Sequence, residues 1–155
     1  MDKEILIQYT YMKAEVKDLH RRIEKLTEEI NNISEVTDYV SCGKKGRKSL
    51  GMRKVTGFPY PRYEQAKRIL QERKNRLALA EEKLLELTGA VEKYIDEMDN
   101  SELRILFRLY YVDGLIWDMV AMKMNYMFPK RKIAYTKDNC RKRHDRFLEK
   151  FEKNL

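Results

Sequence analysis

The stretch Met98–Phe151 reads MDNSELRILFRLYYVDGLIWDMVAMKMNYMFPKRKIAYTKDNCRKRHDRFLEKF and begins with a short helical pattern. Asn100 and Ser101 suit a helix N-cap, because their side-chain oxygens can accept hydrogen bonds from the first backbone N–H groups of a helix. The apolar residues that follow recur at helical spacing: Leu103, Leu106, Phe107 and Tyr110. Asp113-Gly114 should end this helix, since glycine tolerates a positive φ.

Two more helices are expected after Gly114, separated by a basic connection. The second has one apolar face, formed by Trp117, Val120, Ala121 and Met124. Thr136 can cap the third, whose apolar positions lie four, three and four residues apart at Cys140, His144, Phe147 and Phe151. The rest of that helix is densely basic, with Lys137, Arg141, Lys142, Arg143 and Arg146. Short helices, a turn and a basic helix on a small apolar core are typical of a helix-turn-helix.

Two runs within this stretch resemble a known group of regulators. Leu106–Ala121, LFRLYYVDGLIWDMVA, resembles the LRYIDGLSWxxVA pattern of phage- and prophage-encoded transcriptional regulators whose C-terminal domain is similar to region 4 of the primary sigma factors. Asn139–Leu148, NCRKRHDRFL, resembles the end of their recognition helix. The resemblance implies DNA binding and transcriptional control. The chain departs from the pattern at Ile116, where a serine or threonine usually caps the second helix, and in a longer turn from Asn125 to Tyr135.

Two long helices with apolar seams are expected before residue 98. In the first, about Lys3 to Ser34, spacings of three and four separate Tyr9, Met12, Val16, Leu19, Ile23, Leu26, Ile30 and Ile33. Residues 63–98 continue the same rule with Ala66, Leu70, Arg73, Leu77, Ala80, Leu84, Leu87, Val91, Tyr94 and Met98. The first helix would be on the order of 45 Å long, too long to be buried in this chain without a partner helix. The two seams fit an antiparallel hairpin within one chain, and pairing between chains fits the same pattern.

The net charge of +8 is concentrated in two segments. Residues 36–62 carry 7 basic and 1 acidic side chains and residues 100–155 carry 13 and 7, whereas the two remaining segments are each slightly acidic. Such basic clusters are expected where polyanions bind. The first cluster is centred on GKKGRKSLG, Gly43–Gly51, which also looks like one branch of the regulator group. We expect it to be a mobile, glycine-flanked loop that can follow a phosphate backbone.

Several other chemistries lack their sequence patterns. The chain has no phosphate-cradling loop, HExxH, GxSxG or nucleophile–base pattern, so we expect a non-enzyme without a cofactor. Cys42 and Cys140 have neither disulfide nor metal spacing, and Cys140 and His144 are expected in the core rather than in a zinc site. Without a signal peptide or an apolar run of membrane-spanning length, the sequence predicts a cytoplasmic protein with no membrane partner.

The leading hypothesis is an all-α transcriptional regulator that binds double-stranded DNA, with a helical hairpin at 1–98, a basic loop at about 36–62 and a helix-turn-helix module at 99–155. The third helix would enter the major groove and place Lys137, Asn139, Arg141 and Lys142 nearest the base edges. Phosphates would be held by Lys130, Arg131, Lys132, Arg143 and Arg146 in this module and by Lys44, Lys45, Arg47 and Lys48 in the loop. The hairpin would set the geometry of a homo-oligomer or reach RNA polymerase.

Two other functions fit parts of the same pattern. A small-terminase-like DNA-packaging protein also joins a helix-turn-helix to a helical oligomerisation element, and it would form a ring of many subunits. A coiled-coil adaptor or inhibitor would instead use the helix-turn-helix to bind protein. The longer turn and the residue at Ile116 favour this second alternative, which predicts no binding to any DNA at low salt.

Overall fold

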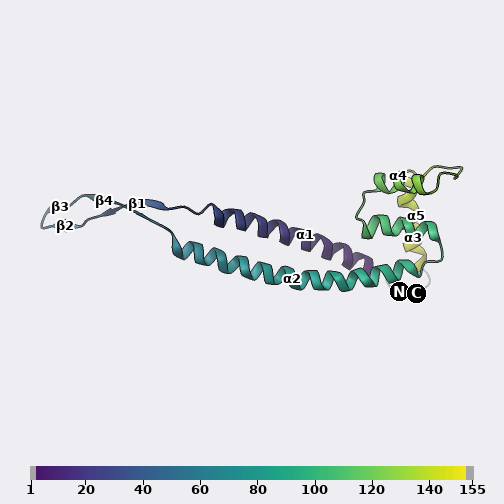
Figure 1. Ribbon diagram of the computed structural model, residues 1–155, viewed down its shortest axis with the longest axis horizontal. Helices are drawn as coiled ribbons and strands as arrows, with labels where there is room; N and C mark the ends of the chain where they lie inside the picture. Colours follow the sequence, from purple (N-terminus) through teal and green to yellow (C-terminus); the bar gives the residue numbers. More distant parts are fainter. Residues whose placement is uncertain (1–2, 153–155) are drawn as a thin grey trace. The chain divides into compact units, whose positions relative to one another are not determined.

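The computed structural model describes residues 3–152 and is mostly helical, with a small strand part (Figure 1). In chain order its elements are α1 (Glu4–Asn31), β1 (Val36–Ser41), β2 (Lys44–Lys45), β3 (Lys48–Ser49), β4 (Met52–Gly57), α2 (Tyr60–Asp96), α3 (Ser101–Phe107), η1 (Arg108–Val112), α4 (Trp117–Met127) and α5 (Lys137–Glu152). The expected all-α fold is therefore approximate, because strands occupy part of the segment expected to be a loop. No helix within residues 3–152 combines the length and the apolar character needed to cross a membrane.

The apolar seams of the two long helices are confirmed. Every seam position predicted in the segments 3–34 and 63–98 is buried or partly buried, including the polar member Arg73. The first helix ends at Asn31, slightly before the expected Ser34, and α2 begins at Tyr60, slightly before the expected start. The carbonyl of Pro59 accepts an early hydrogen bond of α2 from the Tyr63 N–H at 3.0 Å.

The contacts divide the chain into two compact units, one formed by residues 16–79 and the other by residues up to 15 together with those from 80 onward. In the first unit Leu19 and Leu26 are the buried seam residues of α1. The guanidinium of Arg73 in α2 donates to the backbone carbonyl of Arg22 in α1 at 3.3 Å, which ties the two helical segments together.

The segment between these helices is a two-stranded β-ribbon rather than the mobile loop that the sequence predicts. β1 pairs antiparallel with β4, from Val36 opposite Gly57 to Ser41 opposite Met52, and β2 pairs with β3. Between the two pairs of strands the Cys42 N–H donates to the Gly51 carbonyl at 2.9 Å. The Leu50 N–H donates to the Gly43 carbonyl at 3.0 Å, so the same register continues to the tip. Gly46 begins the two-residue turn with a φ of +61°, a conformation that glycine adopts without strain.

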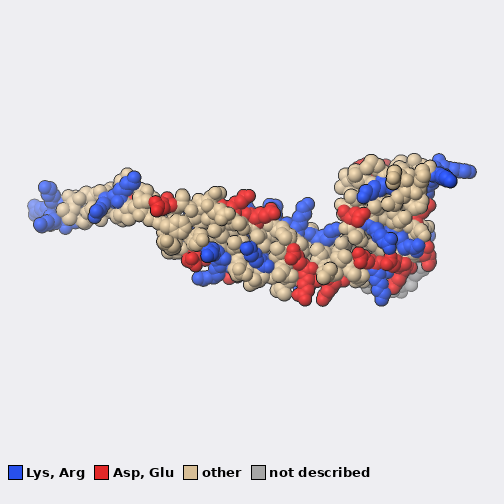
Figure 2. All heavy atoms as spheres, in the orientation of Figure 1, with Lys and Arg blue, Asp and Glu red and all other residues tan. Residues whose placement is uncertain are grey.

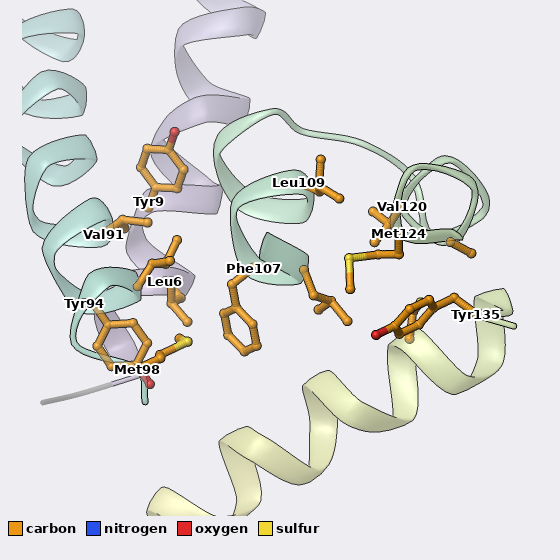
Figure 3. Packing of buried hydrophobic residues seen from close by; sticks show 14 residues of the cluster. Leu6, Tyr9, Val91, Tyr94, Met98, Phe107, Leu109, Val120, Met124 and Tyr135 are labelled. Atoms are coloured by element: carbon orange, nitrogen blue, oxygen red, sulfur yellow. The ribbon is translucent and has the colours of Figure 1, made fainter. Parts of the chain in front are cut away.

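The core of the second unit draws on five helices and on the connection before α5. Figure 3 shows Leu6 and Tyr9 of α1, Val91 and Tyr94 of α2 and Met98, just after α2, facing Phe107 and Leu109, with Val120, Met124 and Tyr135 beyond them. Phe107, Val120 and Met124 are fully buried. This cluster includes residues on both sides of residue 98, where the sequence predicts a boundary between the hairpin and the DNA-binding module.

Candidate nucleic-acid interface

The first short helix begins as its sequence predicts and ends in a wider turn. The Asn100 Oδ1 accepts hydrogen bonds from the backbone N–H groups of Glu102 at 2.9 Å and Leu103 at 3.2 Å, so Asn100 is the N-cap. The helix then widens into the π-helical turn η1, where the Asp113 N–H reaches the Arg108 carbonyl at 3.0 Å. Gly114 follows with a φ of +67°. The extra residue of a π-turn changes which side chains face the neighbouring helices.

Lys13 of α1 closes this π-turn. Its Nζ donates to the carbonyl oxygens of Tyr111 at 3.0 Å and Val112 at 3.1 Å, which lie in the last turn of the helix. A lysine at the C-terminal end of a helix satisfies orphan carbonyls and is favoured by the negative end of the helix dipole. The N-terminal part of α1 therefore supports the helices that follow residue 98.

The second short helix, α4, packs on the π-turn through aromatic side chains. The rings of Trp117 and Tyr110 stack at 4.0 Å with an angle of 12° between their planes. Val120, Ala121 and Met124 are buried on the face predicted from the sequence. Within the described chain, Ile116 occupies the N-cap of α4 without making a side-chain cap hydrogen bond. The departure from the regulator pattern at this position thus leaves α4 without the usual cap.

The longer connection between α4 and α5 is held closed by the side chain of Asn125. Its Nδ2 donates to the Tyr135 carbonyl at 2.8 Å, and its Oδ1 accepts from the Tyr135 N–H at 2.6 Å. These two bonds join the last turn of α4 to Tyr135, two residues before α5 begins. The additional residues consequently form a loop whose two ends are held together by Asn125. The helices α4 and α5 still pack directly against each other.

A cluster of charged residues fixes the same connection to α3. The Glu102 Oε2 accepts from Arg131 Nη1 at 2.7 Å and from Arg143 Nη1 at 2.8 Å. The two guanidinium carbons lie 4.3 Å and 5.4 Å from the centre of the Tyr135 ring, which is 3% exposed. A hydrogen bond from the Tyr135 hydroxyl lowers the pKa of Glu102, and the two arginines add to this effect. We call Glu102, Arg131, Tyr135 and Arg143 the arginine clamp.

Replacing Glu102 with glutamine should lower the free energy of unfolding by about 1–2 kcal/mol at neutral pH, because two partly buried guanidinium groups lose their shared anion. The expected loss of stability is small because about a third of the Glu102 side chain is exposed to solvent, which screens the ion pairs. A carboxyl group with a lowered pKa stabilises the folded state above its unfolded pKa, and this stabilisation is lost as the pH falls through the folded value. The difference between wild type and variant should therefore shrink below about pH 4.

Urea unfolding followed by the fluorescence of Trp117, the single tryptophan of the chain, measures this difference. Glu149→Gln makes the same chemical change at an exposed position of α5 and serves as the matched control. Equal stabilities of Glu102→Gln and wild type at neutral pH would show that the clamp does not stabilise the fold.

The third short helix, α5, has one face buried in the aromatic core. Thr136 accepts a hydrogen bond from the Asn139 N–H at 3.3 Å, as expected for a capping residue. Cys140 is fully buried and His144 is 8% exposed, as predicted for core positions. His144 Nε2 lies 2.8 Å from the Tyr111 hydroxyl, and Nδ1 lies 2.9 Å from Asp145 Oδ1. Burial lowers the pKa of His144, against the opposing effect of Asp145. The side chain of Phe151 lies outside the described residues.

The four residues predicted to contact base edges differ in their surroundings. Arg141 and Lys142 lie on the exposed side of α5, and the Arg141 Nε is 3.8 Å from Asp145 of the same helix. Lys137 is also exposed, with its Nζ 3.6 Å from Asp118. Asn139 is turned toward the preceding connection, where its Nδ2 donates to the Ala134 carbonyl at 3.3 Å. Arg141 and Lys142 are therefore the best-placed candidates for an approaching ligand.

The predicted phosphate contacts fall into three groups. Lys130, Lys132 and Arg146 are exposed, whereas Arg131 and Arg143 are engaged in the arginine clamp. The sequence gives no sign of this second role, because the clamp joins residues from three separate segments. Lys44, Lys45, Arg47 and Lys48 are all exposed at the tip of the β-ribbon. Figure 2 shows basic side chains gathered at that tip and another group on the connection before α5.

The described residues contain no group of three or more histidine, cysteine, aspartate or glutamate side chains placed to hold a metal ion. The exposed candidate residues are lysine and arginine side chains, which lie on α5 and on the connection before it in one unit and at the tip of the β-ribbon in the other.

The relationship of the chain to known proteins adds no further constraint. No family model matches it, and neither does any curated protein or solved structure.

Proposed function

We propose that this protein is a DNA-binding transcriptional regulator of phage or mobile-element origin. In this proposal α1 and α2 form a long antiparallel hairpin, and α3 to α5 form a helix-turn-helix module similar to sigma-factor region 4. The module would insert α5 into the major groove. The hairpin would set the geometry of a homo-oligomer or contact RNA polymerase.

The observation that carries the proposal is the two-sided character of α5. Cys140 and His144 anchor one side in the core, so the orientation of the helix is fixed. The other side presents Arg141 and Lys142 to solvent. An anchored helix can hold an arginine in the orientation needed for two parallel hydrogen bonds to a guanine, which is the most common specific contact in the major groove.

The arginine clamp supports the same geometry indirectly. Because Asn125 and Glu102 tether the longer connection, it does not separate α4 from α5. Lys130 and Lys132 are exposed on this connection, which leads into α5. We assign these two lysines to phosphates, and we assign Arg131 and Arg143 to holding the module together.

The test is a titration of two duplexes, one selected from a random pool by the full-length protein and one with the same bases in scrambled order. Arg141→Ala should cost about 1–3 kcal/mol on the selected duplex and much less on the scrambled one. Arg146→Ala is the matched variant on the same helix, and as a phosphate contact it should weaken both duplexes alike. Equal losses on both duplexes for Arg141→Ala would contradict the role of α5.

A protein-binding adaptor is the second candidate function. Its support is that Ile116, Met119, Met122 and Tyr126 leave apolar surface exposed on or beside α4, while two predicted phosphate contacts are occupied within the clamp. This alternative predicts that neither duplex binds at low salt, where the electrostatic attraction to DNA is strongest.

A further inference from the structure

The β-ribbon is an ordered, elongated feature that the proposed role of α5 does not use. Its register runs unbroken from Val36 opposite Gly57 to Lys45 opposite Lys48. At roughly 3.3 Å per residue this paired segment is about 30 Å long. Side chains on paired strands have fixed spacing, unlike those of a mobile loop, so the ribbon can match a ligand that is itself regular.

Every residue from Ser34 to Gly57 is exposed, so the ribbon buries no apolar face within the described chain. A two-stranded ribbon in this state is only marginally stable in water. Its charged residues are six basic side chains and one acidic side chain: Lys44, Lys45, Arg47, Lys48, Arg53, Lys54 and Asp38. The ribbon would therefore gain order from a long, negatively charged partner, and an acidic polymer complements its charge.

The two faces of the ribbon differ in chemistry. Residues directly opposite each other point to the same side of an antiparallel pair, and successive pairs alternate between the sides. One side of β1 and β4, which we call the polar face, carries Thr37 with Thr56, Tyr39 with Lys54, and Ser41 with Met52. The two threonine hydroxyl groups lie 2.9 Å apart. The other side carries three valines with Asp38 and Arg53.

We propose that the β-ribbon lies in the major groove of double-stranded DNA with its polar face toward the base edges, and that it adds sequence selectivity to that of α5. The major groove, about 12 Å wide, admits a two-stranded ribbon, whereas the minor groove is about 6 Å wide. The hydroxyl and ammonium groups of the polar face can donate to base edges, and the basic tip can bind phosphates. Double-stranded RNA is a poorer partner, because its major groove is deep and narrow.

The inference rests on the proposed function, since both require DNA, but it concerns a separate surface. Lys54→Ala and Arg53→Ala provide a matched pair: each removes one positive charge from β4, at adjacent positions on opposite faces. On the selected duplex, Lys54→Ala should weaken binding roughly tenfold or more, the loss expected for a specific base contact. Arg53→Ala should weaken the selected and scrambled duplexes by the same smaller factor, because it removes only general attraction to phosphates.

Chemical footprinting supplies a second measurement on the same complexes. The wild-type protein should protect guanine N7 atoms, which face the major groove, at positions that become reactive in the Lys54→Ala complex and remain protected in the Arg141→Ala complex. Netropsin, a small molecule that occupies the minor groove, should not displace the ribbon from these positions. Unchanged helical circular dichroism and melting temperature would show that each variant is folded.

Each result has a definite meaning. Equal effects of Lys54→Ala and Arg53→Ala on both duplexes, or footprints that do not change, would overturn the groove assignment. If Arg141→Ala loses selectivity while both ribbon variants behave as wild type, the ribbon proposal fails and the proposed function stands. If the wild-type protein selects no duplex at low salt, both fail, as they would if it preferred a structured RNA over every duplex.

Discussion

Replacing Phe107 with alanine is expected to lower the free energy of unfolding by about 3–5 kcal/mol, because the change removes a fully buried aromatic ring from a core that cannot collapse around the gap. The Phe107 ring lies 5.1 Å from the His144 ring, 5.2 Å from Phe147 and 5.6 Å from Tyr111. These neighbours come from η1 and α5, so the ring joins elements on both sides of the longer connection. A loss of this size is a large part of the 5–15 kcal/mol that typically separates folded and unfolded states.

The measurement is urea unfolding monitored in parallel by Trp117 fluorescence and by helical circular dichroism. Trp117 stacks on Tyr110 in the same core, so its fluorescence reports on the unit that contains Phe107. Tyr126→Ala is the control: it also removes an aromatic ring, but from a side chain that is 86% exposed. It should change stability by no more than about 0.5 kcal/mol. A loss below about 1 kcal/mol for Phe107→Ala would contradict the packing described for this core.

Changing the four basic residues of the ribbon tip to serine should produce the largest loss of DNA affinity, on the selected and the scrambled duplex alike. The residues are Lys44, Lys45, Arg47 and Lys48, all exposed. Each phosphate contact that is lost should flatten the salt dependence by about 0.9 in the slope of log K against log salt. One phosphate contact makes the DNA affinity roughly tenfold higher at 0.1 M salt than at 1 M salt. The loss of several contacts multiplies these factors, so the total loss of affinity at low salt is large.

The matched control removes four exposed basic residues from the long helices instead, namely Lys17, Lys25, Arg68 and Lys74. Both quadruple variants lose the same charge, so a general effect of net charge would weaken DNA binding equally in both. We expect the salt slope of the control to stay close to that of the wild type. Identical slopes for the two variants would show that the tip makes no phosphate contacts of its own.

The long helices could be predicted from the sequence because their signal is local. Seam residues such as Leu19 and Leu26 repeat at spacings of three and four, and that spacing alone determines the face that is buried. The Asn100 cap and the positive φ of Gly114 are local in the same sense. Each of these features depends on residues within one or two helical turns.

The sequence of the β-ribbon contains residues typical of a β-hairpin, but its many lysines and glycines favoured a loop. The β-branched residues Val36, Thr37, Val55 and Thr56 flank the segment. A two-residue turn that begins with glycine, at Gly46-Arg47, is typical of a hairpin. The lysines and glycines between them suggested a mobile loop instead. Only the cross-strand pairing, which joins residues up to 21 positions apart, shows that the segment is ordered.

The arginine clamp and the Asn125 tether could not be predicted from the sequence. Glu102, Arg131 and Arg143 come from α3, the connection and α5, and nothing in their spacing indicates that they share one carboxylate oxygen. The same basic composition suits a phosphate contact or an internal ion pair equally well. Which of the two a given arginine makes depends on the tertiary fold.

Leu6 and Tyr9 are buried among residues that lie far along the chain, from Val91 onward, and this has a consequence for biosynthesis. A ribosome adds roughly 5–20 residues per second, so these two side chains leave it several seconds before Val91, Phe107 and Val120, with which they form one cluster. Residues 16–79 can pair with one another during this interval, because the whole of this unit precedes residue 80 in the chain. The apolar side chains in the first turns of α1 stay exposed until these later residues have been translated. We therefore expect the emerging chain to depend on chaperones at this stage, and to be most prone to aggregation before residue 120 is translated.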